Sequence, residues 1–512
     1  MGIKRFYADK DNTITNAYES NLINSASQAN MGSSDILEVF SIYAQASSQS
    51  LEQSRALISF PIGEISASRS TKKIPAVGDV KFFLRMFNAK HSQTLPEKYY
   101  LHILPINTQH WPEAVDPQQN EGWTEGYGLD MESYTDSGSS NWENARTDQS
   151  WADFGASGVT DTHRIDSNGT VLTASVYFEK GNEDIKLDMT DWVEAWLRNC
   201  PTGSIYQKYD GLLIRLSGTY ESGSNHPRRS YYTKKFFARG TQYFYKKPCI
   251  EAQWDSTIKD RRSNFYASSS LVSPADNLNK IYLYNYTRGQ LKNIPLGNSS
   301  ENIYVSLYAD TDGKPTGAPL TTLPTTPITG GIYANKTGIY SASIAVTTAA
   351  TVLHDVWFSG SNQYFTGTIK IKNFAASSYN DPSDSYVTNV KNLKPSYNKN
   401  EIPRLRLFTR NKNWCPTIYT VASTKAEPAV VEDAFYKVVR VSDDFEAVAY
   451  GTGSNEMYNT RLSIDVSGNY FDLDMSLLEP DYMYEIKFLY YLNGEYHEQD
   501  EKFKFRIEKN ER

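Results

Sequence analysis

The chain runs from Asp188-Met-Thr-Asp-Trp-Val-Glu-Ala-Trp-Leu-Arg198 into Tyr209-Asp-Gly-Leu-Leu-Ile-Arg-Leu-Ser217 and later into Pro248-Cys-Ile-Glu-Ala-Gln-Trp-Asp255. The first stretch predicts a short amphipathic helix, because its apolar residues recur at helical spacing. The other two are short apolar runs between turn-forming residues, a pattern that predicts strands. A helix followed by strands, of which the last is an outer strand, indicates the C-terminal half of a β-sandwich.

The helix is expected over Thr190 to Arg198, with Asp188 or Thr190 as its N-cap. Cys200-Pro-Thr-Gly203 is expected to end it, because proline cannot continue a helix and glycine turns the chain. The residues that share its apolar face are Trp192, Val193, Trp196 and Leu197.

Elsewhere the chain shows short apolar and aromatic runs and almost no long helical periodicity, which predicts a mainly β protein. The clearest expected strands are Val80 to Phe87, Tyr100 to Ile106, Val171 to Phe178, Leu212 to Leu216, Ile281 to Tyr286 and Ile303 to Tyr308.

The length of 512 residues exceeds what one hydrophobic core usually supports and predicts two to four domains, and the polar and turn-rich stretches along the chain divide it into three. Residues 1–260 are predicted to form a jelly-roll-like β-sandwich, whose last strand ends at Trp254-Asp255 where the polar run Ser256 to Asn264 follows. Residues 261–374 have the strand spacing of an immunoglobulin-like β-domain, and residues 375–512 form a C-terminal β-domain behind the linker Ala375 to Asp384. In this last domain Asn493-Gly494 predicts a hairpin between the final two strands.

Composition narrows the classes of function. The 37 Tyr and 22 Phe supply large surfaces for burial, so the chain is expected to fold. A net charge of -7 does not indicate nucleic-acid binding. The N-terminus lacks the apolar segment of a signal peptide and no window has the length of a membrane span, so we expect synthesis in a cytoplasm and no membrane association.

No motif for catalysis or for a cofactor is found, so the chain is predicted not to be an enzyme. The seven His and three Cys have no metal-ligand spacing. Asp310-Thr-Asp-Gly-Lys314 resembles the opening of a calcium loop, but Thr321 stands where the bidentate glutamate belongs, so a tight turn explains it better. Acidic pairs such as Asp472 with Asp474 leave a glycoside hydrolase as a third hypothesis.

Four tryptophans lie in a long polar segment, and two interpretations of them stay open. If the indoles are exposed, they can stack on sugar rings or fill a partner's pocket. If the segment folds over a sheet edge, the indoles point inward. These candidate contact residues are Trp111, Trp123, Trp142 and Trp151.

A second candidate is the basic-aromatic run from Tyr231 to Lys247. Alternating aromatic and basic residues can stack on and neutralise a single nucleic-acid strand, but a strand with one solvated face gives the same pattern. We interpret the run as an edge strand that contacts another subunit, and we expect charge reversal at Lys234 and Lys235 to impair assembly. The residues assigned to this contact are Tyr231, Lys234, Lys235, Phe237 and Arg239.

The order of these pieces resembles the DNRLRE-type domain, a jelly-roll-like β-sandwich related to carbohydrate-binding modules, over residues 5 to 256. Ile185 to Trp196 resembles the helix of that family, with Met189 where valine is usual. The other matching pieces are Tyr7 to Ile14, the Asn-x-Gly turn within Asn30 to Leu37, the R-x-L-I-x-F strand Arg55 to Pro61, and the W-x-E pieces at Trp123 and Trp142. The tryptophan segment is longer and more polar than in the family.

Proteins that combine this domain with further β-modules also resemble virion structural proteins of tailed bacteriophages, which need no signal peptide because lysis releases them. The resemblance implies a non-enzymatic component of the neck, tail or capsid exterior, with other virion proteins and copies of itself as partners. The alternative is a carbohydrate-binding adhesin or host-receptor-binding protein, whose partner is a glycan.

Overall fold

The computed structural model describes residues 2–47, 50–90, 96–108, 111, 122–158, 160–163, 173–198, 209–221, 230–296, 302–332, 336–347, 350–372, 386–412, 429–453, 457–492 and 494–509. The chain is mainly β and divides into two compact units, Ile3–Trp254 and Asp255–Arg512, the second with Met1–Gly2. In the described part of the chain no helix combines the length and the apolar character needed to cross a membrane.

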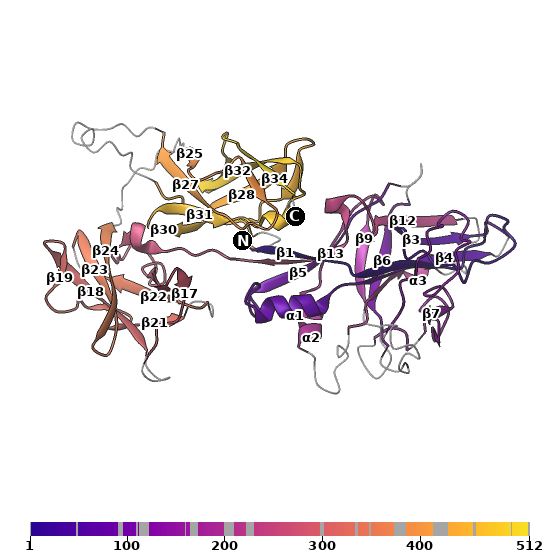
Figure 1. The fold of residues 1–512 in the computed structure, drawn as a ribbon, viewed down its shortest axis with the longest axis horizontal. Coiled ribbons are helices and arrows are strands. Elements are labelled where there is room, and N and C mark those ends of the chain that lie inside the picture. Colours follow the sequence, from indigo (N-terminus) through magenta and orange to yellow (C-terminus); the bar gives the residue numbers. More distant parts are fainter. Residues whose placement is uncertain are drawn as a thin grey trace. The chain divides into compact units, whose positions relative to one another are not determined.

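The N-terminal unit is a sandwich of two sheets (Figure 1). Among the described residues, one sheet has the order β1-β13-β5-β10 and the other the order β12-β3-β4-β11-β6-β9, with β2 paired to β4. Their elements are β1 (Ile3–Tyr7), β2 (Lys10–Thr15), β3 (Ile36–Tyr43), β4 (Leu51–Ser59), α1 (Ile62–Ser70), β5 (Val80–Met86), β6 (Tyr99–Pro105), β7 (Asn144–Arg146), β8 (Gln149–Ser150), β9 (Ala174–Phe178), β10 (Ile185–Asp188), α2 (Thr190–Leu197), β11 (Leu212–Leu216), α3 (Gly218–Glu221), β12 (Ser230–Phe237) and β13 (Cys249–Trp254).

Strict alternation along these strands builds the core between the two sheets. In β6, Tyr99, Leu101 and Ile103 face inward and are fully buried. In β5, Phe82, Leu84 and Met86 meet them from the opposite sheet. Since successive side chains of a strand point to opposite faces, each strand leaves its other set of residues on the outer face of its sheet.

The predicted helix is confirmed as α2, and the strands of 80–87, 100–106, 212–216 and 303–308 are confirmed with ends that differ by at most three residues. The backbone amide of Thr190 donates to Asp188, but the residue at the N-cap is Met189. The expected stop at 200–203 lies outside the described residues. The sequence reasoning missed α1, which buries only Ile65 and Ser68 and therefore has no apolar face to detect.

In the second unit, strands of residues 265–372 surround one apolar core. The described ladder has the order β14-β24-β23-β18-β21-β22-β15 and is continuous because β21 pairs with β18 at one end and with β22 at the other. The elements are β14 (Phe265–Tyr266), β15 (Asn279–Tyr284), β16 (Tyr286–Thr287), β17 (Gln290–Leu291), β18 (Ile303–Thr311), β19 (Lys314–Thr316), β20 (Thr322–Leu323), β21 (Ile328–Ile332), β22 (Ile339–Val346), β23 (Val352–Ser359) and β24 (Asn362–Lys372).

The strands of residues 386–508 form two further sheets, described in the orders β25-β27-β31-β30 and β26-β34-β32-β28-β29. Their elements are β25 (Tyr386–Val390), β26 (Ser396–Asn398), β27 (Arg404–Asn411), β28 (Ala434–Arg440), β29 (Phe445–Val448), β30 (Ser463–Asp465), β31 (Gly468–Asp472), β32 (Met483–Leu492), β33 (Glu495–Glu498) and β34 (Phe503–Glu508). The boundary at 374/375 stays a prediction, and its linker lies outside the described residues.

The predicted hairpin does not join the final two strands. Leu492, at the end of β32, pairs with Glu495, the first residue of β33, and Asn493 lies outside the described residues. β33 occupies one half of an edge of β32, while β34 occupies the other half. β33 was missed, because its four residues Glu-Tyr-His-Glu are all exposed and show no apolar alternation.

The polar run Ser256 to Asn264, where the first domain boundary was expected, is anchored in the second unit by ion pairs. Arg262 is buried and pairs with Asp260 at 3.1 Å and with Asp355. The indole nitrogen of Trp357 donates to the same Asp355 at 2.7 Å. Lys259 pairs with Asp433 at 3.0 Å. Ion pairs can place polar residues inside a protein, and a hydropathy pattern does not detect such an arrangement.

Candidate functional site

The candidate site lies on the outer face of the β12-β3-β4-β11-β6-β9 sheet, where the four tryptophans gather. Their indoles pack on outward-facing side chains of this sheet, such as Leu57, Leu104 and Leu213. The exposed fraction is 1% for Trp123, 6% for Trp142 and 4% for Trp151, while Trp111 is half-buried against Trp151. The inward-pointing alternative is therefore the one observed for Trp123, Trp142 and Trp151.

Hydrogen bonds and a cation hold these rings in place. The indole nitrogen of Trp123 donates to the carbonyl of Asp210 at 2.9 Å, and that of Trp151 donates to the carbonyl of Asn141 at 2.9 Å. The guanidinium of Arg55 stands 5.0 Å from the Trp142 ring centre. Because Trp123, Trp142 and Trp151 are buried, the idea that these three indoles stack on a sugar is corrected: they fasten the segment to the sheet.

The Asn-x-Gly turn explains how the tryptophan segment is clamped. The side-chain amide of Asn30 donates to the carbonyls of Glu125 and Ser140 at 2.9 and 2.8 Å. A Cβ added at Gly32 would stand 1.9 Å from the carbonyl oxygen of Glu125. Gly126 has φ +80° and lies against the Asn30 side chain. The glycines are therefore required by close packing and by backbone conformation.

Strand β12 is a terminal strand of its sheet, as the edge-strand interpretation expected. Its outward face carries Tyr231, which is 49% exposed, Lys235, which is paired with Glu38, and Phe237, whose ring lies 5.4 Å from that of Tyr243. Arg239, just beyond the strand, pairs with Glu125. Lys235, Phe237 and Arg239 are already in contact with other side chains of the unit, whereas the Tyr231 ring is exposed.

Lys234 departs from that expectation. It is 0% exposed, because alternation turns it with Phe236 toward the core of the sandwich. Burial lowers the pKa of the Lys234 amine to about 8. Lys234 therefore cannot belong to a subunit-contacting surface, and it is removed from the assigned contact.

Residues of the same unit form backbone hydrogen bonds with one half of the edge of β12 that faces away from β3. The amide of Phe237 donates to the carbonyl of Phe87 at 3.0 Å, and the carbonyl of Lys235 accepts from Ala89 at 3.0 Å. These bonds show that odd-numbered residues of β12 direct their backbone groups away from β3. Among the described residues, Tyr231 and Thr233 have no backbone partner on that side.

The sequence reasoning missed one exposed aromatic surface, the tyrosine face, which we define as Tyr100, His102, Ser175, Tyr177 and Arg215. Tyr100 and Tyr177 are cross-strand partners on β6 and β9, with ring centres 4.9 Å apart and exposed fractions of 45% and 47%. In the neighbouring row His102 lies between Arg215 and Ser175. Burial and the charge of Arg215 lower the pKa of His102. The signal for this face was the alternation within Tyr99-Tyr100, which forces one ring outward.

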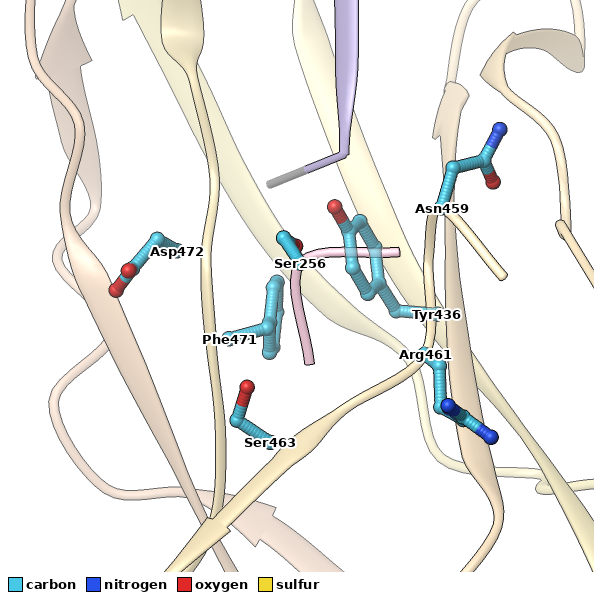
Figure 2. Close-up of a pocket in the computed structure, with 7 residues that line it drawn as sticks. All are labelled: Ser256, Tyr436, Asn459, Arg461, Ser463, Phe471 and Asp472. Carbon is cyan, nitrogen blue, oxygen red and sulfur yellow. The ribbon is translucent and has the colours of Figure 1, made fainter. Parts of the chain in front are cut away.

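A small hollow occurs in the second unit (Figure 2). Its volume is about 20 Å³, which suits a water molecule and is far below the roughly 300 Å³ at which small-molecule pockets begin. The Tyr436 hydroxyl and the Asn459 side-chain oxygen are buried there without a hydrogen-bond partner among the described residues. Its lining is Ser256, Tyr436, Asn459, Arg461, Ser463, Phe471 and Asp472.

The residues considered for metal binding lie as follows. Asp312 and Gly313 form the two-residue turn between β18 and β19, both with positive φ, so the tight-turn interpretation of this calcium-like motif is confirmed. His354 bonds Asp310 at 2.6 Å. Burial raises the pKa of the Cys249 thiol to about 12. Within the described ranges, no group of three or more His, Cys, Asp or Glu side chains is placed to hold a metal ion.

No protein-family model and no curated protein sequence matches this chain. Among solved structures it is similar to a Ca²⁺-stabilised adhesin with which an Antarctic bacterium binds ice, at a TM-score of 0.14 and 11% identity, over 68% of this chain and 64% of that one. It is also similar to Salmonella alpha-2-macroglobulin reacted with methylamine, at a TM-score of 0.15 and 8% identity, over 98% of this chain and 26% of that one. The chain thus spans less than two thirds of either neighbour, and likenesses at these TM-scores carry no argument.

Proposed function

We propose that this chain is a non-enzymatic structural component of a tailed-phage virion, placed at the neck, tail or capsid exterior, that assembles through subunit contacts. Its partners are other virion proteins and further copies of itself, and it needs no cofactor. The supporting observation is the uncovered half of β12, where Tyr231 and Thr233 have no backbone partner among the described residues. An edge of this kind can receive a strand from a neighbouring subunit.

The side chains around that edge favour a protein partner over nucleic acid. Tyr231 offers an exposed ring, whereas the basic residues nearby are engaged: Lys234 is buried, and Lys235 and Arg239 are paired with carboxylates. Strand addition takes its affinity from backbone hydrogen bonds and its specificity from side chains such as this ring. The resemblance to the DNRLRE-type domain and the modular β architecture support the same class of protein.

The test combines particle labelling with the assembly of the purified full-length chain. Antibodies to the chain are expected to label phage particles, and native mass spectrometry is expected to show oligomers. Tyr231→Lys, which charges the edge, is expected to weaken self-association at least tenfold. Tyr177→Lys, at an equally exposed tyrosine on the opposite terminal strand, is the matched control and is expected to keep it. A monomeric chain together with unlabelled particles would refute the proposal.

The second candidate is a carbohydrate-binding adhesin or host-receptor-binding protein, and the tyrosine face favours it. Two exposed rings 4.9 Å apart, with His102 and Arg215 in the next row, provide an apolar platform beside hydrogen-bonding groups. Sugar rings bind to such platforms through their apolar faces. The test is a glycan array with the full-length chain: binding lost in Tyr177→Ala and kept in Tyr231→Ala supports this candidate, and a blank array refutes it.

A further inference from the structure

Lys234 holds an unusual position for a lysine of an edge strand. Its side chain points into the sandwich, with the ammonium nitrogen 4.7 Å from the ring centre of Phe178 and 5.1 Å from that of Phe236. Within the described residues, no carboxylate oxygen lies within ion-pair distance of Nζ. A lysine that is fully buried without a carboxylate partner is rare, because removing an ammonium from water is costly.

The three groups that Nζ contacts come from two other parts of the unit. Nζ donates to the side-chain oxygen of Asn88 at 2.7 Å and to the carbonyls of Gly181 and Glu183 at 2.9 and 2.8 Å. Asn88 lies two residues beyond Met86, the last residue of β5, and forms a backbone bridge with Phe236. Whichever way the Asn88 amide is turned, its Cγ atom is next to the lysine nitrogen.

The side-chain carboxyl of Glu183 is the third group considered, beside the Lys234 amine and the Asn88 amide. One side-chain oxygen of Glu183 accepts from the amides of Glu179 and Lys180 at 3.0 and 2.6 Å. The other oxygen is buried and has no hydrogen-bond partner among the described residues. The backbone carbonyl of the same residue accepts from Nζ, and the charge of Glu183 raises the pKa of Lys234 against the effect of burial.

We propose that Lys234 and Asn88 react to form an intramolecular isopeptide bond, with Glu183 as the proton carrier. The neutral amine of Lys234 attacks Cγ of Asn88, a new C–N bond forms, and the bond from Cγ to Nδ2 breaks. The amide nitrogen leaves as ammonia, and the proton it gains is the one that Nζ loses, relayed by the free oxygen of Glu183. One amine and one primary amide become one secondary amide and ammonia, and no oxidant or reductant is required.

The environment suits both partners of this reaction. A pKa of about 8 for the Lys234 amine, lowered by burial, makes the neutral nucleophile accessible near neutral pH. Phe178 and Phe236 exclude water, so the amide is shielded from hydrolysis. The bond would join the end of β5, in one sheet, to β12, in the other. It would thereby lock the two sheets of the sandwich together, whichever function the unit serves.

The test is a peptide map and an intact mass of the full-length chain. The expected result is a mass lower than the sequence mass by one ammonia and, after proteolysis, a branched peptide that contains both Lys234 and Asn88. A succinimide at Asn493-Gly494 would lose the same mass, so the branched peptide is the deciding observation. Finding Lys234 and Asn88 only in separate, linear peptides, after incubation at mildly alkaline pH, overturns the proposal.

Three variants separate the reaction from folding. Asn88→Ala is expected to abolish the branched peptide. Glu183→Gln keeps both reacting groups and is expected to slow their joining at least tenfold. Lys235→Met, at the neighbouring lysine whose amine pairs with Glu38, is expected to leave the branched peptide intact. Joining at an unchanged rate in Glu183→Gln would overturn the role given to Glu183, and circular dichroism verifies that each variant is folded.

Discussion

Arg55 and Glu221 form a two-point ion pair on the outer face of the N-terminal sandwich, with Nη2 to Oε2 at 2.9 Å and Nε to Oε1 at 3.1 Å. Both side chains are buried. The same guanidinium donates to the carbonyl of Gly155 and stacks on Trp142. Arg55 thus joins the tryptophan segment to the short helix α3, which explains the arginine at the start of the R-x-L-I-x-F strand.

Arg55→Met should lower the free energy of unfolding by about 3–5 kcal/mol, because it leaves the buried carboxylate of Glu221 without its partner. Urea denaturation followed by tryptophan fluorescence measures the change. The exposed residue Lys81, replaced by alanine, should change stability by less than about 0.5 kcal/mol. Equal stabilities of the two variants would contradict the structural role of Arg55.

Trp123→Ala should lower the free energy of unfolding by about 3–5 kcal/mol, since it empties a buried site and leaves the Asp210 carbonyl without its indole donor. Thermal denaturation tests this. On a glycan array the folded fraction should bind as the wild type does. A variant with normal stability and a specific loss of glycan binding would restore the stacking role that burial rules out.

Gly330→Ala should destabilise the second unit by about 1–3 kcal/mol, because a Cβ would stand 2.7 Å from the Trp357 ring, which is itself buried. The adjacent Gly331 is the matched control: a Cβ there meets nothing within 4 Å. Gly331→Ala should therefore change stability by less than about 0.5 kcal/mol. Denaturation of both variants side by side decides the comparison, and equal losses would be inconsistent with the packing of β21.

Asp11 should make stability depend on pH. Its carboxyl is buried and accepts from the Arg239 amide at 2.6 Å, and burial raises its pKa to about 7. Because the unfolded value is near 3.9, this group stabilises the fold below about pH 4, and that contribution is lost as pH rises through about 7. Asp11→Asn should therefore lose less stability than the wild type between about pH 5 and about pH 8. The exposed Asp35, replaced by asparagine, should keep the wild-type dependence.

Lys234 and Lys235 should respond differently to charge reversal. Lys234→Glu buries an unpaired carboxylate against the carbonyls of Gly181 and Glu183, so the N-terminal unit should lose at least about 3 kcal/mol of stability. Lys235→Glu places a like charge beside Glu38 at a half-buried position and should cost about 1–2 kcal/mol. Denaturation midpoints measure both. Similar losses would show that Lys234 is not inside.

The strand pattern and α2 could be predicted from sequence because local periodicity is enough to recognise them. The apolar pattern of a strand at Leu212 to Leu216 and that of a helix at Thr190 to Leu197 can each be recognised within a few residues. Burial of a polar or aromatic side chain is different, since it depends on what packs against it. The neighbouring sequence does not show that Lys234 is buried while Lys235 is half-buried, or that the Trp123 indole is buried.

The sequence by itself determined that this chain is mainly β and that Asp312-Gly313 is a tight turn, because alternation and turn chemistry are local properties. Only the tertiary structure decided which face of each strand is covered. In that structure Trp123, Trp142 and Trp151 are buried, and Lys234 is buried beside Asn88. Arg262 is held by ion pairs, whereas Tyr100 and Tyr177 are exposed. The physical reason is that burial is fixed by contacts between residues far apart in the chain.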